Sequence, residues 1–296
     1  MIFLDGVGIG NDDPSCNPFF KNEFKTFTQI FGDTPSEKNS SLSGDKTFLF
    51  PTDANLGVNG LPQSGTGQVT IFTGVNAPKF IGKHFGPYPY STTIPLLEKK
   101  SIYKAFIEKN ETVFFANAYP DIFFNYLKKG RSILSCTTLA CRLTGIRLNR
   151  LTDLKRGKAL TAEITNERWI NKLNYNLPVI SPEKAADRLL RIASKYKFTL
   201  YEYYLTDHMG HGREGTDFMK LYHSLDSFLL RVLTKMNKEE LTVVICSDHG
   251  NLEDLSVKTH TNNPALTITA GKYAEILSKN IKDLTDIKPA IIKYCK

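Results

Sequence analysis

Acidic residues and histidines stand close together at two places in the sequence. The stretch "LTVVICSDHGN" leads from an apolar run directly into Asp248 and His249, and "DHMGH" places Asp207 four residues before His211. A buried strand gains nothing from ending in an acid and an imidazole. Carboxylate oxygens and imidazole nitrogens are, however, ligands that Zn²⁺, Mn²⁺ and similar ions take from proteins. These four residues are therefore candidate metal ligands.

Two further candidates are more isolated. Asp5 ends "MIFLD" and His260 begins "HTNNP". A single Asp after a strand is often a turn former or a helix cap, and a single loop histidine often has no special role. The chain has only six histidines, however, and half of them lie in these motifs. We leave out His208, whose spacing from Asp207 is less suitable, and His223, which lies on the polar side of a predicted helix.

The stretch "GLPQSGTGQVTIFTGVNAP" could supply a nucleophile. Small residues lead into "QVTIFTG", which is typical of the first turns of a buried helix. A hydroxyl at a helix N-terminus faces the positive end of the dipole and unpaired N–H groups, and a nearby metal ion would lower its pKa further. Ser64 and Thr66 are the hydroxyls at this position. Taken by itself, the stretch is more typical of a Gly/Ser turn with an N-cap.

Four apolar runs of strand length would position these residues. They are residues 1–5, 113–117, 199–205 and 241–246. Their near-continuous hydrophobicity is typical of a parallel sheet covered on both faces. Helices are predicted between them, one beginning at Ser181 and Pro182 and another near Thr216. Together they predict an α/β fold, in which ligands bind beyond the carboxyl ends of the strands.

Two stretches depart from this alternation. Residues 33–47 are polar and rich in serine, which predicts a mobile surface loop. Residues from about 120 to 178 are basic and irregular, and we interpret them as a small inserted cap. The predicted domains are a metal-binding α/β core, residues 1–118 and 180–296, and a cap, residues 119–179.

The composition is that of an ordinary globular protein, with 41% hydrophobic and 23% charged residues. No apolar run approaches the roughly 18–20 residues of a membrane span, and the N-terminus lacks the features of a signal peptide. Five cysteines without CxxC spacing favour neither a disulfide framework nor a zinc ribbon. We therefore expect a reduced, cytoplasmic protein without a membrane partner.

The net charge of +8 favours an anionic partner, which could be a nucleic acid or a phosphorylated substrate. The lysines are scattered, however, and a genome-wide compositional bias accounts for them as well. A nucleic-acid partner is therefore not predicted. A dinucleotide site is excluded too, because Asn11 stands where "GVGIG" would need its third glycine.

Five motifs occur in the order used by the alkaline phosphatase superfamily. They are "LDGVGIG", "SGTGQVTIFTG", "DHMGH", "SDHGN" and "HTNNP", and they extend from residue 5 to residue 264. The chain most resembles the branch of cofactor-independent phosphoglycerate mutases and phosphopentomutases, and "LTDIKPAIIKY" is similar to the closing segment of that branch. The resemblance implies an alkaline-phosphatase-like core with a mostly parallel sheet flanked by helices.

The resemblance also implies two divalent metal ions, Mn²⁺ or Zn²⁺, with Mg²⁺ as an alternative. By motif, one ion would be held by Asp207, His211 and His260. The other would be held by Asp5, Asp248 and His249. Family members carry the nucleophile ten residues before a glycine, which selects Ser64 before Gly74 and leaves Thr66 in reserve. The implied reaction is phosphoryl transfer from a small phosphorylated substrate through a phosphoserine intermediate.

The segment after the nucleophile helix could contact the phosphate through Asn76, Lys83 and His84. Two departures from the mutase pattern favour a hydrolase of phosphate esters. The insertion is smaller than the mutases' cap domain, which keeps water from the phosphoryl group, and "SGTGQ" lacks the acid that the mutases carry beside the nucleophile. The alternatives are a mutase acting on a small phosphorylated metabolite, and a metal-bound protein that binds phosphorylated ligands without turnover.

Overall fold

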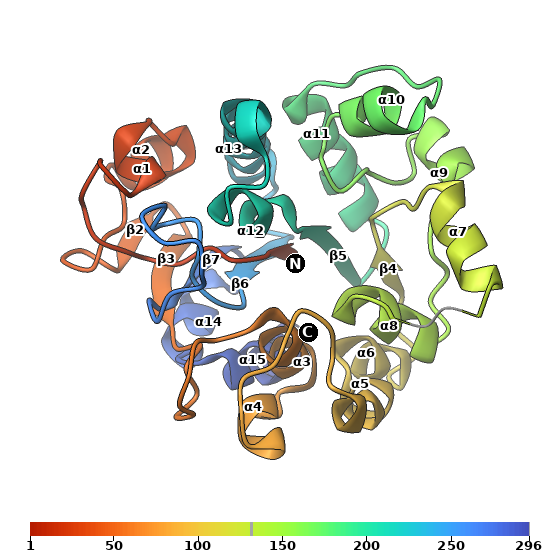
Figure 1. The fold of residues 1–296 in the computed structure, drawn as a ribbon, viewed down its shortest axis with the longest axis horizontal. Coiled ribbons are helices and arrows are strands. Elements are labelled where there is room, and N and C mark those ends of the chain that lie inside the picture. The colour runs from red at the N-terminus through yellow and green to blue at the C-terminus, as the bar shows by residue number, and fades with distance from the viewer. Residues whose placement is uncertain (131–132, 296) are drawn as a thin grey trace.

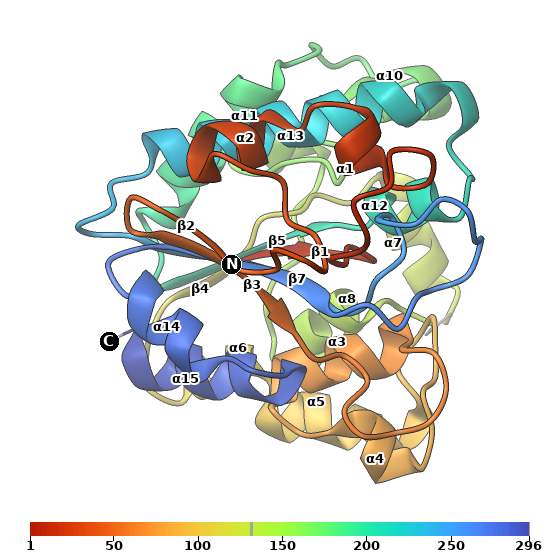
Figure 2. The same cartoon turned by 90° about the vertical axis from the view of Figure 1, so that its left-hand side faces the viewer.

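The computed structural model describes residues 1–130 and 133–295 of the chain. Within this part, the strands form one sheet in the order β2-β3-β7-β6-β1-β5-β4. Helices cover both faces of the sheet, which gives three layers (Figures 1 and 2). The strands are β1 (Ile2–Leu4), β2 (Leu42–Gly44), β3 (Thr47–Thr52), β4 (Val113–Phe115), β5 (Phe198–Tyr203), β6 (Thr242–Ser247) and β7 (Ala265–Gly271). The predicted α/β class is confirmed.

The four predicted strands form the parallel half of the sheet. β1 pairs in parallel with β5 and with β6, and β4 pairs in parallel with β5. Every residue of β1 and β5 is buried, because helices lie above and below these strands. The interpretation of the near-continuous apolar runs as parallel strands is therefore confirmed.

The other half of the sheet is antiparallel and was not predicted. β7 pairs antiparallel with β6 and with β3, and β3 pairs antiparallel with β2. The prediction of a loop over residues 33–47 is wrong in its second part, because β2 lies within it and β3 begins at Thr47. Leu42 and Leu49, which pair across this hairpin, both contact the core. The serine-rich composition of residues 33–47 gave no sign of the hairpin. The sheet as a whole is mixed, with parallel and antiparallel strands.

The upper layer contains the two helices that the sequence predicted. α11 begins with Ser181 as its N-cap, whose hydroxyl accepts a hydrogen bond from the Lys184 N–H, and with Pro182 in the first turn. α13 follows a short 3₁₀ turn (Gly215–Asp217) and buries an apolar face against the sheet. The helices of this layer are α1 (Pro18–Lys21), α2 (Lys25–Phe31), α10 (Glu167–Leu173), α11 (Pro182–Ala193), α12 (Leu205–Gly210) and α13 (Phe218–Lys235).

The lower layer packs around α3, the helix predicted from "QVTIFTG". Val69 and Phe72 of α3 are fully buried in the hydrophobic cluster of this layer, the lower core, which also contains Leu277 of α14 and Ile291 of α15. The helices of this layer are α3 (Ser64–Thr73), α4 (Ala77–Ile81), α5 (Ile94–Lys100), α6 (Ile102–Ile107), α8 (Cys136–Leu143), α14 (Ala274–Asn280) and α15 (Ile287–Tyr294). Short 3₁₀ turns lie at Ser91–Thr93 and Leu284–Asp286.

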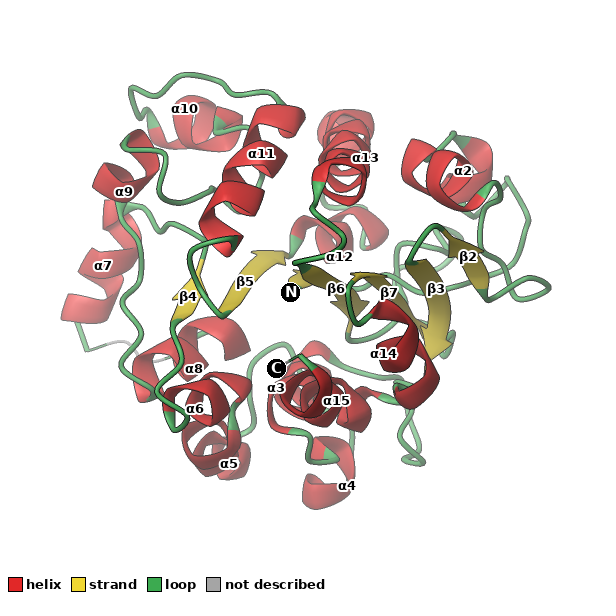
Figure 3. Cartoon of the chain, turned by 180° about the vertical axis from the view of Figure 1, so that it is seen from behind, coloured by secondary structure: helices red, strands yellow, loops and turns green. Residues whose placement is uncertain are grey.

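The segment interpreted as a cap, residues 119–179, surrounds the β4 end of the sheet (Figure 3). It contains α7 (Asp121–Lys128), α8, α9 (Leu151–Lys155) and α10, and residues 131 and 132 within it lie outside the described residues. Cys136 and Cys141 of α8 are buried in the lower core, whereas Trp169 of α10 packs in a small separate cluster. The domain boundary therefore stays a prediction. Among the described residues, no helix is long and apolar enough to cross a membrane.

Candidate functional site

Three neighbouring parallel strands bring the predicted ligands to one edge of the sheet. β1 lies between β5 and β6 and pairs with both up to its last residue. The chain therefore leaves all three strands at the same level. Asp5 follows β1, Asp248 follows β6, and Asp207 lies in the first turn of α12, which begins after β5. This edge is where open α/β sheets bind ligands.

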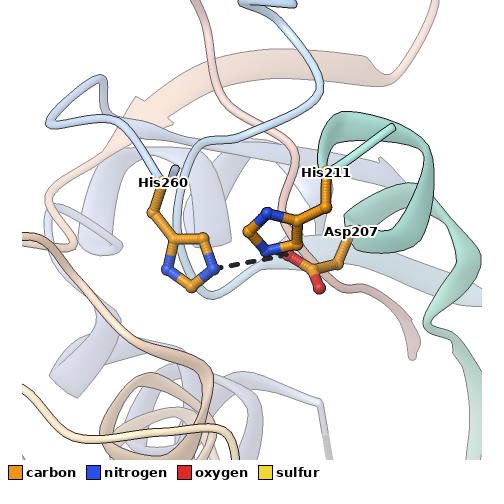
Figure 4. Close-up of side chains that lie close together, drawn as sticks. All are labelled: Asp207, His211 and His260. Atoms are coloured by element: carbon orange, nitrogen blue, oxygen red, sulfur yellow. Dashed lines mark ion pairs between the residues drawn. The ribbon is translucent and has the colours of Figure 1, made fainter. Parts of the chain in front are cut away.

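The first cluster consists of Asp207, His211 and His260 (Figure 4). Nε2 of His211 lies 3.2 Å from Oδ1 of Asp207, and Nε2 of His260 lies 3.4 Å from the same oxygen. Two ligand atoms that are each about 2.1 Å from one ion in tetrahedral geometry are about 3.4 Å apart. The donor spacing of the first cluster therefore suits a single metal ion.

The second cluster consists of Asp5, Asp248 and His249. Nε2 of His249 lies 3.4 Å from Oδ1 of Asp5 and 3.6 Å from Oδ1 of Asp248. The imidazole rings of His249 and His260 are stacked, with centroids 3.7 Å apart and planes 16° apart. The two clusters are therefore adjacent, and the structure brings together all six residues that the motifs predicted.

Backbone carbonyls fix the tautomer of each histidine. Nδ1 of His211 is 2.7 Å from the carbonyl oxygen of Lys258, and Nδ1 of His260 is 2.7 Å from that of Pro62. Nδ1 of His249 is 3.2 Å from the carbonyl oxygen of its neighbour in the chain. A carbonyl can only accept, so each Nδ1 carries the proton. This leaves Nε2, which faces the cluster in each ring, as the nitrogen that would bind a metal ion.

The two carboxylates of the second cluster lie beside the imidazole of His249. Burial, and then the nearby charge of Asp248, raise the pKa of Asp5 to about 7. Burial also raises the pKa of Asp248. Burial alone would lower the pKa of His249, but Asp248 and Asp5 outweigh it and raise that pKa to about 10. Acids whose pKa values are raised by burial fit a site that a divalent cation completes.

Ser64 is the first residue of α3 and lies beside the second cluster. Its Oγ is 2.9 Å from Nε2 of His249 and 3.3 Å from Oδ1 of Asp5. The Thr66 hydroxyl is engaged elsewhere, because it donates to the carbonyl of Gln63 and accepts from the N–H of Phe85. The N–H of Thr66 also donates to the Phe85 carbonyl, so it is not available to an anion. Of the two predicted hydroxyls, only that of Ser64 lies against a cluster.

The two residues next to Ser64 and Thr66 in α3, Gly65 and Gly67, have no room for a side chain. A Cβ on Gly67 would lie 2.9 Å from both Cβ and the carbonyl oxygen of Asp248, and a Cβ on Gly65 would lie 2.1 Å from the carbonyl oxygen of Tyr88. Both distances are shorter than carbon atoms tolerate. The pattern "SGTGQ" therefore lets α3 approach the end of β6 closely enough for Ser64 to reach His249.

Three residues that the sequence did not single out support the clusters. Gln68, one turn after Ser64, donates from Nε2 to Asp248 (3.2 Å) and to Asp5 (3.4 Å). Asn251 donates to Oδ1 of Asp207 at 2.7 Å. Glu253 is 1% exposed and accepts hydrogen bonds from the loops that carry both clusters. For Gln68, the sequence signal was its spacing of four residues from Ser64, which places both on one face of the helix. Asn251 and Glu253 had no such signal.

A cleft of about 330 Å³ opens over Asp5, Ser64 and Asp207. It is also lined by Glu202, a buried residue of β5 that accepts a hydrogen bond from the Thr137 hydroxyl at 2.6 Å. Burial raises the pKa of Glu202 to about 7. The other residues that line the cleft are Gln68, Pro87, Tyr88, Asn117, Ala118, Tyr119, Ser135, Ala162, Tyr204, His208 and Arg213.

The three predicted phosphate contacts do not line this cleft. Asn76 is the N-cap of α4, where its side chain accepts from the Lys79 N–H. Lys83 lies 5.9 Å from the centroid of the Phe85 ring, and Nε2 of His84 lies 3.2 Å from the carbonyl oxygen of Val58. The structure gives these side chains local roles, whereas His208, which was not predicted as a site residue, lines the cleft.

A model of the Metalloenzyme superfamily matches residues 173–296, a segment that carries the first cluster and two residues of the second. The 2,3-bisphosphoglycerate-independent phosphoglycerate mutase of Mycoplasmopsis pulmonis (strain UAB CTIP) is 32% identical over 123 residues. This match covers 40% of the chain and 24% of the mutase, so the chain corresponds to about a quarter of this relative's length.

Two solved structures share the fold over nearly their whole length. The alkaline phosphatase of the Antarctic bacterium TAB5 has a TM-score of 0.53 at 12% identity, covering 99% of this chain and 97% of that chain. A cold-active alkaline phosphatase from Shewanella sp. has a TM-score of 0.54 at 11% identity, covering 100% and 99%. The family match, the mutase relative and the shared fold confirm the predicted resemblance to the metalloenzymes of the alkaline phosphatase superfamily.

Proposed function

We propose that this protein is a dinuclear metal-dependent phosphoryl-transfer enzyme that hydrolyses phosphate esters through a phosphoserine at Ser64. The observation that carries the proposal is the position of the Ser64 hydroxyl, 2.9 Å from Nε2 of His249 and 3.3 Å from Oδ1 of Asp5. A hydroxyl at the first residue of a helix and beside a candidate metal cluster is placed to act as a nucleophile.

The donor sets support two divalent ions. The first cluster would hold one ion and the second cluster the other, with mixed oxygen and nitrogen ligands that suit Mn²⁺ or Zn²⁺, and Mg²⁺ less well. When bound, the ions supply charge that lowers the pKa of the attacking hydroxyl and offsets the charge on the phosphoryl oxygens.

Ser64 carries out the phosphoryl transfer, and other residues of the chain support it. Ser64 Oγ forms a bond to phosphorus while the bond from phosphorus to the ester oxygen breaks. The hydroxyl proton passes to solvent, and the leaving oxygen takes a proton from solvent. A water molecule then cleaves the phosphoserine and restores the Ser64 hydroxyl. The N-terminus of α3 stabilises negative charge at the attacking oxygen, and Gln68 holds the carboxylates of Asp5 and Asp248 in place.

Hydrolysis is favoured over mutase chemistry because water can reach the cleft. Tyr88 and Tyr204, which line it, are 46% and 38% exposed. Cys136 and Cys141 of α8 are packed in the lower core, whereas Tyr119, Ser135 and Ala162 of the insertion line the cleft. The matched relative is a mutase, so a mutase acting on a small phosphorylated metabolite is the second candidate. A cleft of about 330 Å³ suits a small substrate in either case. We also propose a cytoplasmic location, from the five cysteines without CxxC spacing.

Phosphate release tests the proposal. We would measure it from a panel of phosphate monoesters and diesters with Mn²⁺ or Zn²⁺, for wild type, Ser64→Ala and Thr66→Ala. We expect metal-dependent release by wild type and by Thr66→Ala, and its loss in Ser64→Ala with metal content unchanged. Isomerised product without phosphate would indicate the mutase. Equal metal content and no activity in any form would indicate a protein that binds phosphorylated ligands without turnover.

A further inference from the structure

The cleft has a basic residue that the proposed reaction does not use. Arg213 lines the cleft together with Asp5, Ser64 and Asp207. Its side chain is exposed, and within the described part of the chain it has no ion-pair partner. Its backbone N–H donates to the carbonyl of His208 at 2.9 Å, which keeps the residue beside the first cluster.

The acid next to Arg213 is already fully engaged. Glu214 is buried, with its side chain 4% exposed. Its Oε2 accepts from Nη1 of Arg168 at 2.8 Å, and its Oε1 accepts from Nδ1 of His208 at 3.1 Å. Both carboxylate oxygens of Glu214 therefore already have partners. Because Glu214 does not pair with Arg213, the Arg213 guanidinium can bind a ligand.

The loop that carries Arg213 is held in a defined shape. Gly212 and Gly215, on either side of the pair, have φ angles of +70° and +49°, which residues with a side chain rarely adopt. Helix α10 of the insertion contacts the region through Arg168 and through an ion pair between Glu167 and Lys220. Arg213 is therefore presented from an anchored turn and not from a free loop.

We propose that Arg213 binds a second anionic group on the substrate, a carboxylate or a phosphate carried by the part that leaves. The inference rests on the proposed function, because it takes the transferred phosphate to lie at Ser64. A guanidinium presents paired N–H donors that match the planar oxygens of a carboxylate or two oxygens of a phosphate. The preferred substrates are therefore small esters with an anionic leaving group. Glu214 and Arg168 act as positioning residues for the turn.

A binding experiment tests the subsite without turnover. Calorimetry would compare 3-phosphonopropionate with 3-hydroxypropylphosphonate, which differ in the second charge, on the metal-loaded protein. We expect wild type to bind the carboxylate about tenfold more tightly, as for one exposed charge-assisted hydrogen bond. Arg213→Ala should lose this preference and Arg213→Lys should keep part of it. Arg156→Ala, which removes an exposed arginine outside the cleft lining, should bind as wild type does.

Parallel turnover assays separate this inference from the proposed function. Phosphoglycolate and 2-hydroxyethyl phosphate are the matching esters, and 1,2-ethanediol bisphosphate tests a second phosphate in place of the carboxylate. Turnover without an Arg213-dependent preference would refute the subsite and leave the hydrolase. A preference in binding that depends on Arg213, without turnover of any ester, would refute the hydrolase and support the subsite. An equal loss for both phosphonates in Arg213→Ala would also refute it.

Discussion

Replacing Glu253 with glutamine should weaken both the fold and the metal centre. Oε2 of Glu253 accepts from the backbone N–H groups of Gly8 and Asn251, each at 2.8 Å. Oε1 accepts from the Thr261 hydroxyl at 2.5 Å and from Nδ2 of Asn263 at 3.1 Å. One carboxylate thus joins the segment after Asp5 to the segments that carry the histidines of both clusters.

The magnitude follows from the four donors. In Glu253→Gln the amide oxygen can keep the two backbone bonds, and the Thr261 hydroxyl and the Asn263 amide can reorient toward the new NH₂ group. The loss is then mainly the charge assistance of two bonds, about 1 kcal/mol each. We expect a fall of about 2 kcal/mol in the free energy of unfolding for glutamine. For Glu253→Ala, which leaves four donors without their acceptor, we expect about 4 kcal/mol.

Urea unfolding of the metal-free protein and a Zn²⁺ competition titration would measure the two effects. We expect Zn²⁺ affinity to fall about 10- to 100-fold, as when the groups that orient metal ligands are changed. Asp254→Asn is the matched control, because Asp254 is adjacent and, within the described part of the chain, its carboxylate accepts hydrogen bonds only from Ser256. Wild-type urea midpoints and Zn²⁺ affinity in Glu253→Gln would show that the carboxylate does not organise the centre.

Two further substitutions test the centre itself. Asp5→Asn should stabilise the metal-free protein by up to about 4 kcal/mol at pH 8, because a pKa raised from 3.8 to about 7 when folded costs stability as pH rises from about 4 to 7. The gain should vanish at pH 4 and reverse with saturating Zn²⁺, and a gain that is equal at both pH values in urea unfolding would contradict this cause. Gly67→Ala should lower metal-dependent kcat about 100-fold, because its Cβ would lie 2.9 Å from Asp248 and displace α3. Full activity in phosphate-release assays would show that the close approach is unnecessary.

The sequence predicted the candidate ligands because each stands in a local pattern. Asp5 and Asp248 directly follow β1 and β6, and His211 comes four residues after Asp207. A strand end is visible in a few consecutive residues, and parallel strands must end at a common edge. Positions that depend only on neighbouring residues and on this general rule could therefore be predicted without a structure.

The supporting residues could not be predicted in the same way. Glu202 is an acid in the middle of an apolar run, and its position beside the cleft depends on which strands flank β5. Glu253 binds partners as distant in sequence as Gly8. Arg213 is one basic residue among many in a chain of net charge +8. For each of them, the contact is set by the topology, and no local pattern carries that information.

The antiparallel strand that the sequence did not predict is the one that completes the site. β6 ends at the ligand edge, and because β7 runs antiparallel to it, the chain re-enters the sheet at that same edge. A helical crossover to a parallel strand would instead have carried the chain to the opposite edge. The connecting segment is closed by a bridge between Gly250 and Thr261. It therefore brings His260 back beside His249, where the two rings stack at 3.7 Å. One connecting segment thus supplies ligands to both clusters. The distance between the two clusters is therefore set by the segment that joins β6 to β7.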